Sequence, residues 1–247
     1  MRISKRRWTF VPKDGHTKYM NSENCYVASV TTILKLLGKD ALIGWANSLG
    51  WKRKRVSDEL AKASAIGSIA HTYIEKIIKG ETIELKLDVL SDDIKIGVIN
   101  SLNSFIKWWK KNKHRVELLN IELELCGLDY GGTADLVCLL DGELTILDFK
   151  TSGNFYFTMF LQLAAYAKLY NELVNKIDGV SQVGILRVDK KNGNEAQLMT
   201  MDDVIDRGNL SLTRKEAINE YISVYDKIAD LFYSIYDISK DWGCDMC

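Results

Sequence analysis

The stretch Gly132-Thr133-Ala134-Asp135-Leu136-Val137, together with Asp141-Gly142 and Leu147-Asp148-Phe149-Lys150, decides the fold of this chain. Asp141-Gly142 is a two-residue pair typical of a type I′ turn, and apolar runs rich in β-branched residues flank it on both sides. The stretch therefore predicts a β-hairpin whose strands cover residues 133–140 and 143–149.

The register of this hairpin sets two carboxylates face to face. If Leu140 pairs with Glu143, counting back along both strands places Asp135 opposite Asp148, with their Cβ atoms roughly 5 Å apart. Lys150 points to the same face as Asp148, because strand side chains alternate with period two. Opposed like charges are destabilising, so a cation is expected between them: Lys150 supplies one charge and a divalent metal the rest. The alternative is a salt-bridged strand end, with Asp148 paired to Lys150 and Asp135 solvated.

Periodicity predicts helices before the hairpin and alternating elements after it. The expected fold is an α/β (α+β) domain with a mixed central β-sheet flanked by helices. A turn is expected around Asn192-Gly193. The predicted helices cover residues 29–37, 40–49, 56–79, 92–113, 157–173 and 212–238, and the predicted strands cover residues 116–125, 133–140, 143–149, 180–188 and 196–199.

Composition limits the possible classes of protein. The chain has 247 residues, 47% of them hydrophobic, and its 33 basic residues balance its 33 acidic residues. One compact domain is expected, and polyanion binding has to come from local patches. No apolar run approaches the roughly 20 residues of a membrane span, and no apolar signal core follows the basic N-terminus, so a soluble intracellular protein is predicted. Five cysteines at scattered spacing do not describe a disulfide framework, and Cys126 and Cys138 are expected in the core.

Further polar residues accompany the hairpin. His71 lies on a predicted helix four residues before Glu75, and Gln162 lies four residues before Tyr166 on another, inside an apolar stretch. A buried glutamine needs hydrogen-bond partners. On the strand before the hairpin, Glu122 and Glu124 alternate with apolar residues and are expected on one side. Taken singly, each has an ordinary structural explanation.

Together these residues resemble the PD-(D/E)XK nucleases of the RecB type. The resemblance rests on an ordered series over residues 67–166: Gly67-Ser68-x-x-His71, Glu122, Gly132-Thr133-x-Asp135, Asp148-Phe149-Lys150-Thr151-Ser152 and Gln162-x-x-x-Tyr166. Upstream, Ser29-Val30-Thr31-Thr32-Ile33-Leu34 and Trp45-Ala46 are similar to phage-type exonucleases of this superfamily and to the mitochondrial genome maintenance exonuclease.

The resemblance implies a restriction-endonuclease-like core and a role for each site residue. His71, Asp135, Asp148 and the backbone carbonyl of Phe149 would hold Mg²⁺ or Mn²⁺, as one ion or two. Lys150 would orient or activate the attacking water and offset charge on the phosphate. Glu122 would supply a further catalytic carboxylate, with Glu124 as the alternative. Gln162 and Tyr166 would order the site and touch the nucleic-acid backbone.

Two clusters combine basic and flat side chains, as binders of single strands do. The first is Trp51 with Lys52, Arg53, Lys54 and Arg55, expected to contact nucleic acid because four consecutive cations repel one another. The second covers residues 107–115 and includes Trp108 and Trp109. For each cluster the alternative is a solvated helix face.

An iron–sulfur cluster is not expected. Some relatives hold one with an early cysteine and three late ones, whereas Cys25, Cys244 and Cys247 supply one ligand fewer. A chain that continues past Cys247, or a ligand other than cysteine, would change that expectation.

These observations predict a metal-dependent DNA exonuclease that acts on single-stranded or end-frayed DNA. It is expected in the cytoplasm of a bacterial or phage-infected cell, serving recombination, repair or replication with phage proteins as possible partners. The alternatives are a structure- or sequence-specific endonuclease of the same fold and a noncatalytic DNA-binding subunit. Residues 1–247 are expected to form one nuclease domain, with a mainly helical part at 1–66, the catalytic core at 67–200 and a C-terminal helix at 201–247.

Overall fold

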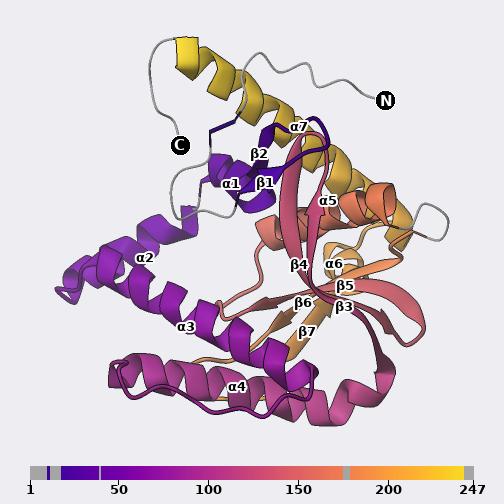
Figure 1. The fold of residues 1–247 in the computed structure, drawn as a ribbon. Coiled ribbons are helices and arrows are strands. Elements are labelled where there is room, and N and C mark those ends of the chain that lie inside the picture. Colours follow the sequence, from indigo (N-terminus) through magenta and orange to yellow (C-terminus); the bar gives the residue numbers. More distant parts are fainter. Residues whose placement is uncertain (1–9, 12–17, 39, 175–178, 242–247) are drawn as a thin grey trace.

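The hairpin around Asp141-Gly142 is present and lies within the central sheet (Figure 1). The structure is a computed structural model that describes residues 10–11, 18–38, 40–174 and 179–241. Asp141 and Gly142 have φ angles of 53° and 83°, the two positive values that a type I′ turn requires. Strands β4 (Tyr130–Leu140) and β5 (Glu143–Lys150) are antiparallel, with Leu140 paired to Glu143 as predicted.

The described strands form one seven-stranded mixed sheet in the order β1-β2-β4-β5-β6-β7, with β3 paired to β4. The β2–β4 and β5–β6 pairs are parallel and the other pairs are antiparallel. This arrangement confirms the predicted mixed sheet. The remaining strands are β1 (Tyr19–Met20), β2 (Tyr26–Ser29), β3 (Val116–Cys126), β6 (Gln182–Arg187) and β7 (Gln197–Thr200).

Strand β4 has a fork along one edge, and this fork positions the candidate site. Strand β3 pairs with β4 along one side, from Gly131 to Leu140. On the other side β2 pairs with Tyr130 and Gly131, whereas β5 pairs from Leu136 onward. Residues 132–135 therefore lie between two different neighbours, and Asp135 is at the point where β5 leaves β4.

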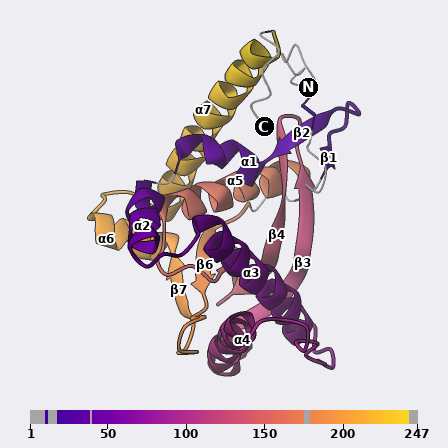
Figure 2. The same cartoon turned by 90° about the vertical axis from the view of Figure 1, so that its left-hand side faces the viewer.

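Helices cover both faces of the sheet (Figures 1 and 2). One hydrophobic core lies under α1, α5 and α7, and a second lies under α3 and α4. Val137 and Ile146 face the first core, whereas their strand neighbours Leu136 and Leu147 face the second. The helices are α1 (Val30–Leu34), α2 (Asp40–Trp51), α3 (Val56–Ile78), α4 (Asp92–Asn112), α5 (Phe157–Leu173), α6 (Met201–Gly208) and α7 (Arg214–Asp241).

The longer elements agree with the sequence predictions, and the short ones account for the differences. Strands β1 and β2 were not predicted, so the part expected to be mainly helical also contributes to the sheet. Ser29 ends β2 instead of beginning a helix; its side chain accepts a hydrogen bond from the Thr32 N–H and caps α1. Helix α6 was also missed, although Thr200 and Asp203 form a capping box at its start.

Candidate active site

The two aspartates of the hairpin are both buried. Asp135 is 8% exposed and Asp148 is 2% exposed. The ion pair of Asp148 with Lys150 that the alternative predicted is present, but its solvated Asp135 is wrong. Burying two carboxylates on adjacent strands is costly unless each has partners, so their contacts show what the site can do.

Asp148 is held by groups from two elements. Its Oδ1 accepts a hydrogen bond of 2.9 Å from Gln162 Nε2 on α5, and the same nitrogen donates to the hydroxyl of Tyr166 at 3.1 Å. Its Oδ2 is fully buried and receives no hydrogen bond from any described residue, but the Lys150 ammonium forms an ion pair with it at 2.5 Å. Gln162 and Tyr166 thus reach the site from α5, as predicted for a buried glutamine.

Asp135 lies between the backbone of β5 and helix α3. Its Oδ2 accepts a hydrogen bond of 2.7 Å from the Phe149 N–H and lies 3.5 Å from His71 Nδ1. Burial, followed by repulsion from Asp148, raises the pKa of Asp135 above its ordinary value, although His71, Lys150 and the Phe149 N–H oppose the rise. Two carboxylates thus lie close together where water is excluded, an environment that favours an additional cation.

Lys150 is an ammonium in this environment. Burial by itself would lower its pKa, but the charges of Asp148 and Asp135 outweigh that effect and the pKa is raised above the ordinary value. In this arrangement Lys150 can donate a hydrogen bond and supply positive charge, but it has no free lone pair with which to accept a proton.

Glu122 joins this group through an unusual backbone conformation. Its φ angle is 52°, a left-handed value that is rare inside a strand. The flanking pairs Ile121–Leu136 and Leu123–Ala134 place it opposite Asp135. Ligand atoms of His71, Glu122 and Asp135 all lie within 4.8 Å of one another.

The carboxyl of Glu122 responds to this crowding although its side chain is exposed overall. Its pKa is raised, first because the surrounding protein removes water and then because Glu75 and Asp148 repel its charge; His71 opposes the rise. Of the two glutamates that the sequence left open, Glu122 lies near the buried aspartates. Glu124 is paired with Thr133.

Two consecutive glycines, Gly131 and Gly132, lie beside the site, and of these the sequence analysis named only Gly132. A Cβ on Gly132 would lie 2.3 Å from Cε1 of Tyr166, and a Cβ on Gly131 would lie 2.6 Å from Cγ of Tyr19. Tyr19 also shares a hydrogen bond of 3.0 Å with the hydroxyl of Thr133. Both rings therefore rest directly on the β4 backbone. Two consecutive glycines in a strand are the signal that pointed to this close approach.

The two basic clusters have different outcomes. The first cluster is exposed and forms the turn between α2 and α3, which does not include the buried carboxylates; its cations are Lys52, Arg53, Lys54 and Arg55. In the second cluster Trp108 is buried and belongs to the core beneath α3 and α4, so the idea that it is available for stacking on bases is wrong.

The cysteines fall in different environments. Cys138 is buried in the core as predicted, but Cys126 is only half-buried and its Sγ donates to the Met20 carbonyl at 3.1 Å. Cys25 is half-buried, and Cys244 and Cys247 lie outside the described residues, so the expectation about an iron–sulfur cluster stays a prediction.

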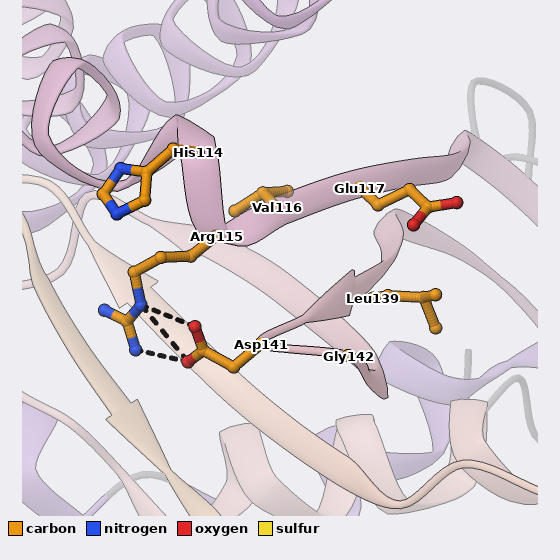
Figure 3. Close-up of a pocket in the computed structure, with 7 residues that line it drawn as sticks. All are labelled: His114, Arg115, Val116, Glu117, Leu139, Asp141 and Gly142. Atoms are coloured by element: carbon orange, nitrogen blue, oxygen red, sulfur yellow. Dashed lines mark hydrogen bonds and ion pairs between the residues drawn. The ribbon is translucent and has the colours of Figure 1, made fainter.

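A hollow of about 520 Å³ lies at the turn end of the hairpin, away from the aspartates (Figure 3). Arg115 bridges it, with Nε donating to Asp141 Oδ1 at 2.9 Å and Nη2 donating to Oδ2 at 2.5 Å. These contacts connect the turn to the residues that precede β3. Because the charged groups of the hollow pair with each other, its polar lining does not indicate a ligand site. The lining residues are His114, Arg115, Val116, Glu117, Leu139, Asp141 and Gly142.

The donor set fits a divalent cation. Carboxylate oxygens with an imidazole suit Mg²⁺ and, still better, Mn²⁺. Three carboxylates, those of Asp135, Asp148 and Glu122, lie near one lysine ammonium, and burial, together with repulsion by neighbouring carboxylates, raises the pKa values of Asp135 and Glu122. A second positive charge beside Lys150 would satisfy all three carboxylates.

A mixed sheet that presents two acidic residues and a lysine at a fork of its central strands defines a class of metal-dependent phosphodiester hydrolases. The family model of the PD-(D/E)XK nuclease superfamily matches residues 45–247, and the chain belongs to this superfamily. A search of the curated proteins finds no matching sequence. Among the described residues, no helix has both the length and the apolar content needed to cross a bilayer.

Proposed function

We propose that this nuclease is a DNA exonuclease of the RecB type that acts on single-stranded or end-frayed DNA. The observation that carries the proposal is the contact of both helix-borne signatures with the acidic pair. Gln162 donates to Asp148, and His71 lies beside Asp135. In the resemblance drawn from the sequence, this histidine and the Gln-x-x-x-Tyr series belong to the RecB-type exonucleases. A role in recombination, repair or replication in the cytoplasm of a bacterial or phage-infected cell is part of the same proposal.

His71, Asp135, Asp148 and the Phe149 carbonyl are the proposed metal ligands, and Glu122 is the proposed additional carboxylate. Bound there, Mg²⁺ or Mn²⁺ would offset charge on the phosphate and lower the pKa of water. The negative charge concentrated by Asp135 and Asp148 supports this assignment.

The remaining residues hold the reacting groups in place. Lys150, as an ammonium, would orient the attacking water and stabilise charge that develops on the phosphate oxygens. Gln162 restricts the carboxylate of Asp148 to one orientation, so that its Oδ2 stays turned toward Lys150. Tyr166 keeps its proton, because burial raises its pKa well above the ordinary value, and it buttresses Gln162 as a neutral phenol.

The test is digestion of end-labelled linear single strands, linear duplex and closed circular DNA, with Mg²⁺, Mn²⁺ or EDTA. The expected result is loss of the linear substrates only, dependent on the metal and abolished in Lys150→Ala. The exposed lysine Lys227 on α7 is not among the residues of the candidate site and offers a control: Lys227→Ala should digest like the wild type.

Two other results would change the assignment. Cleavage of closed circles would replace the exonuclease with an endonuclease of the same fold. Failure to cut all three substrates with either metal would indicate a noncatalytic DNA-binding subunit.

A further inference from the structure

The turn between α2 and α3 presents an unusual group of side chains to solvent. Trp51 is 90% exposed, and the four residues after it, Lys52 to Arg55, are exposed as well. This turn is the left-hand extremity of the molecule in Figure 1, well separated from the sheet. A large indole that is almost fully solvated is uncommon because burying it would be favourable.

The backbone of the turn is well defined. The Lys54 N–H donates to the Leu49 carbonyl and the Arg53 N–H donates to the Gly50 carbonyl, both at 3.0 Å. These two bonds form a Schellman motif, the usual C-terminal cap of a helix. Trp51 and the cations after it are therefore held on a rigid support.

Two of the arginines occupy positions that favour other residues. Arg53 has a φ angle of 54° at the left-handed position of the motif, where glycine is normally found because a Cβ is strained. Arg55 is the N-cap of α3 and makes no side-chain capping bond, where serine or aspartate would make one. It also lies at the positive end of the α3 dipole, which disfavours a cation. Helix stability therefore explains neither arginine.

The positive charge of the turn is largely uncompensated. Lys54 forms an ion pair with Glu59 at 3.2 Å. Among the described residues, Lys52, Arg53 and Arg55 have no ion pair. Three free cations next to a solvated aromatic ring match the two needs of a single-stranded nucleic acid, which are neutralisation of its phosphates and a surface on which a base stacks.

We propose that the α2–α3 turn is a second binding site for single-stranded DNA, with Trp51 stacking on a base and Arg53 and Arg55 contacting phosphates. The inference rests on the proposed nuclease function. In it, the turn binds a part of the DNA strand that lies away from the cleavage site. An acidic protein surface would use the cations without the ring, whereas an anionic membrane surface would use both, so binding to vesicles is measured as the competing outcome.

The geometry of α3 sets the length of strand required. Arg55 precedes His71 by 16 residues along this helix, which corresponds to about 24 Å. At about 3.4 Å per stacked nucleotide, roughly seven nucleotides span that distance. The connecting helix face carries small or uncharged exposed side chains that leave room for a strand: Ser57, Ala61, Ser64 and Ser68.

The variant Arg53→Gly/Arg55→Ser separates binding from folding, because both changes favour the local backbone. Its melting temperature is expected to equal or exceed that of the wild type. Binding of a fluorescent 16-nucleotide oligothymidine is measured by anisotropy in EDTA over a range of salt concentrations. Loss of two phosphate contacts lowers the slope of log K against log salt by about 1.4, which is about 25-fold in affinity at 0.1 M salt. Trp51→Ala is expected to weaken binding about tenfold with the slope unchanged.

Matched control variants and a shorter oligonucleotide make the inference refutable. Arg207→Gln/Lys227→Gln removes two exposed cations from α6 and α7, at the opposite face of the sheet, and should leave binding unchanged. A four-nucleotide oligothymidine, too short to span the distance to His71, occupies the turn alone and should still lose affinity in the Arg53→Gly/Arg55→Ser variant. Equal binding of the 16-mer by that variant, or an equal loss in the control pair, would overturn the inference. So would binding to anionic phosphatidylserine vesicles that is tighter than binding to the oligonucleotide and that weakens in Trp51→Ala.

Binding in EDTA does not depend on cleavage, so the two proposals fail separately. A protein that cuts no DNA but loses oligonucleotide affinity in the turn variants would refute the exonuclease alone. An active exonuclease whose affinity does not depend on the turn would refute this inference alone.

Discussion

Gly132→Ala is expected to disturb the candidate site through a single steric contact. The new Cβ would lie 2.3 Å from Cε1 of Tyr166, 3.0 Å from Cζ and 3.1 Å from the hydroxyl oxygen. Ordinary carbon contacts are about 3.5–4.0 Å, so the ring has to move by more than about 1 Å. Overpacking of this kind costs about 1–3 kcal/mol of stability.

The displacement also has a functional consequence. Gln162 Nε2 donates to Tyr166 at 3.1 Å and to Asp148 at 2.9 Å, so movement of the ring loosens the group that orients the carboxylate. A loss of about 1.4 kcal/mol in transition-state stabilisation would lower kcat about tenfold. Urea denaturation measures the first effect, and steady-state digestion of a labelled single strand measures the second.

Two comparisons make this reasoning refutable. In a Tyr166→Ala background the clash is absent, so Gly132→Ala should cost much less, with a coupling energy of about 1–2 kcal/mol. Gly44→Ala, in an open and exposed position of α2, should instead raise stability by about 0.5–1 kcal/mol. An equal loss in both Tyr166 backgrounds would show that the ring contact is not the cause.

Three further changes test other contacts of the hairpin. Gln162→Leu leaves Asp148 Oδ1 without its donor and is expected to cost about 1–3 kcal/mol in urea denaturation, together with activity; unchanged stability would contradict the buried hydrogen bond. Asp135→Asn removes one of two repelling carboxylates. Because the folded pKa of Asp135 is raised, the wild type without metal should lose stability as pH rises through that folded pKa, whereas the asparagine variant should not; parallel pH profiles in EDTA would refute this. Asp141→Asn breaks the exposed ion pair with Arg115 but tolerates positive φ, so chemical denaturation should show a loss of about 1 kcal/mol or less, and Asp141→Val should lose clearly more; the reverse order would be inconsistent with a type I′ turn.

Elements whose signals are local could be predicted from the sequence. The Asp141-Gly142 turn specifies the hairpin register, because a two-residue type I′ loop fixes which residues pair across it. Helix α5 has the predicted bounds, since a continuous apolar periodicity marks both of its ends. Strands β1 and β2 are too short to give such a pattern, and they form only because β4 and the neighbouring chain offer edges to pair with.

The candidate site was predictable in its membership but not in its arrangement. His71, Asp135, Asp148 and Lys150 stand out in sequence because the hairpin and the family series name them. The left-handed backbone of Glu122 could not be read from the sequence, since a positive φ angle at a glutamate has no signal in the alternation of apolar and polar residues. Trp108 shows the same limit: whether an aromatic residue in a basic helix faces solvent or the core depends on which side of α4 meets the sheet.

The sequence by itself determined the superfamily through its ordered series of motif residues. It also determined the central hairpin and the identity of its opposed carboxylates, because turn chemistry and side-chain periodicity act over a few residues. Only the tertiary structure decided that both aspartates are buried, that Gln162 reaches Asp148 and that Tyr166 rests on Gly132. It also decided that Trp51 stays in water beside three cations that form no ion pair within the described part of the chain. Those outcomes depend on contacts between segments far apart in the chain, where packing and desolvation determine which side of each element is covered.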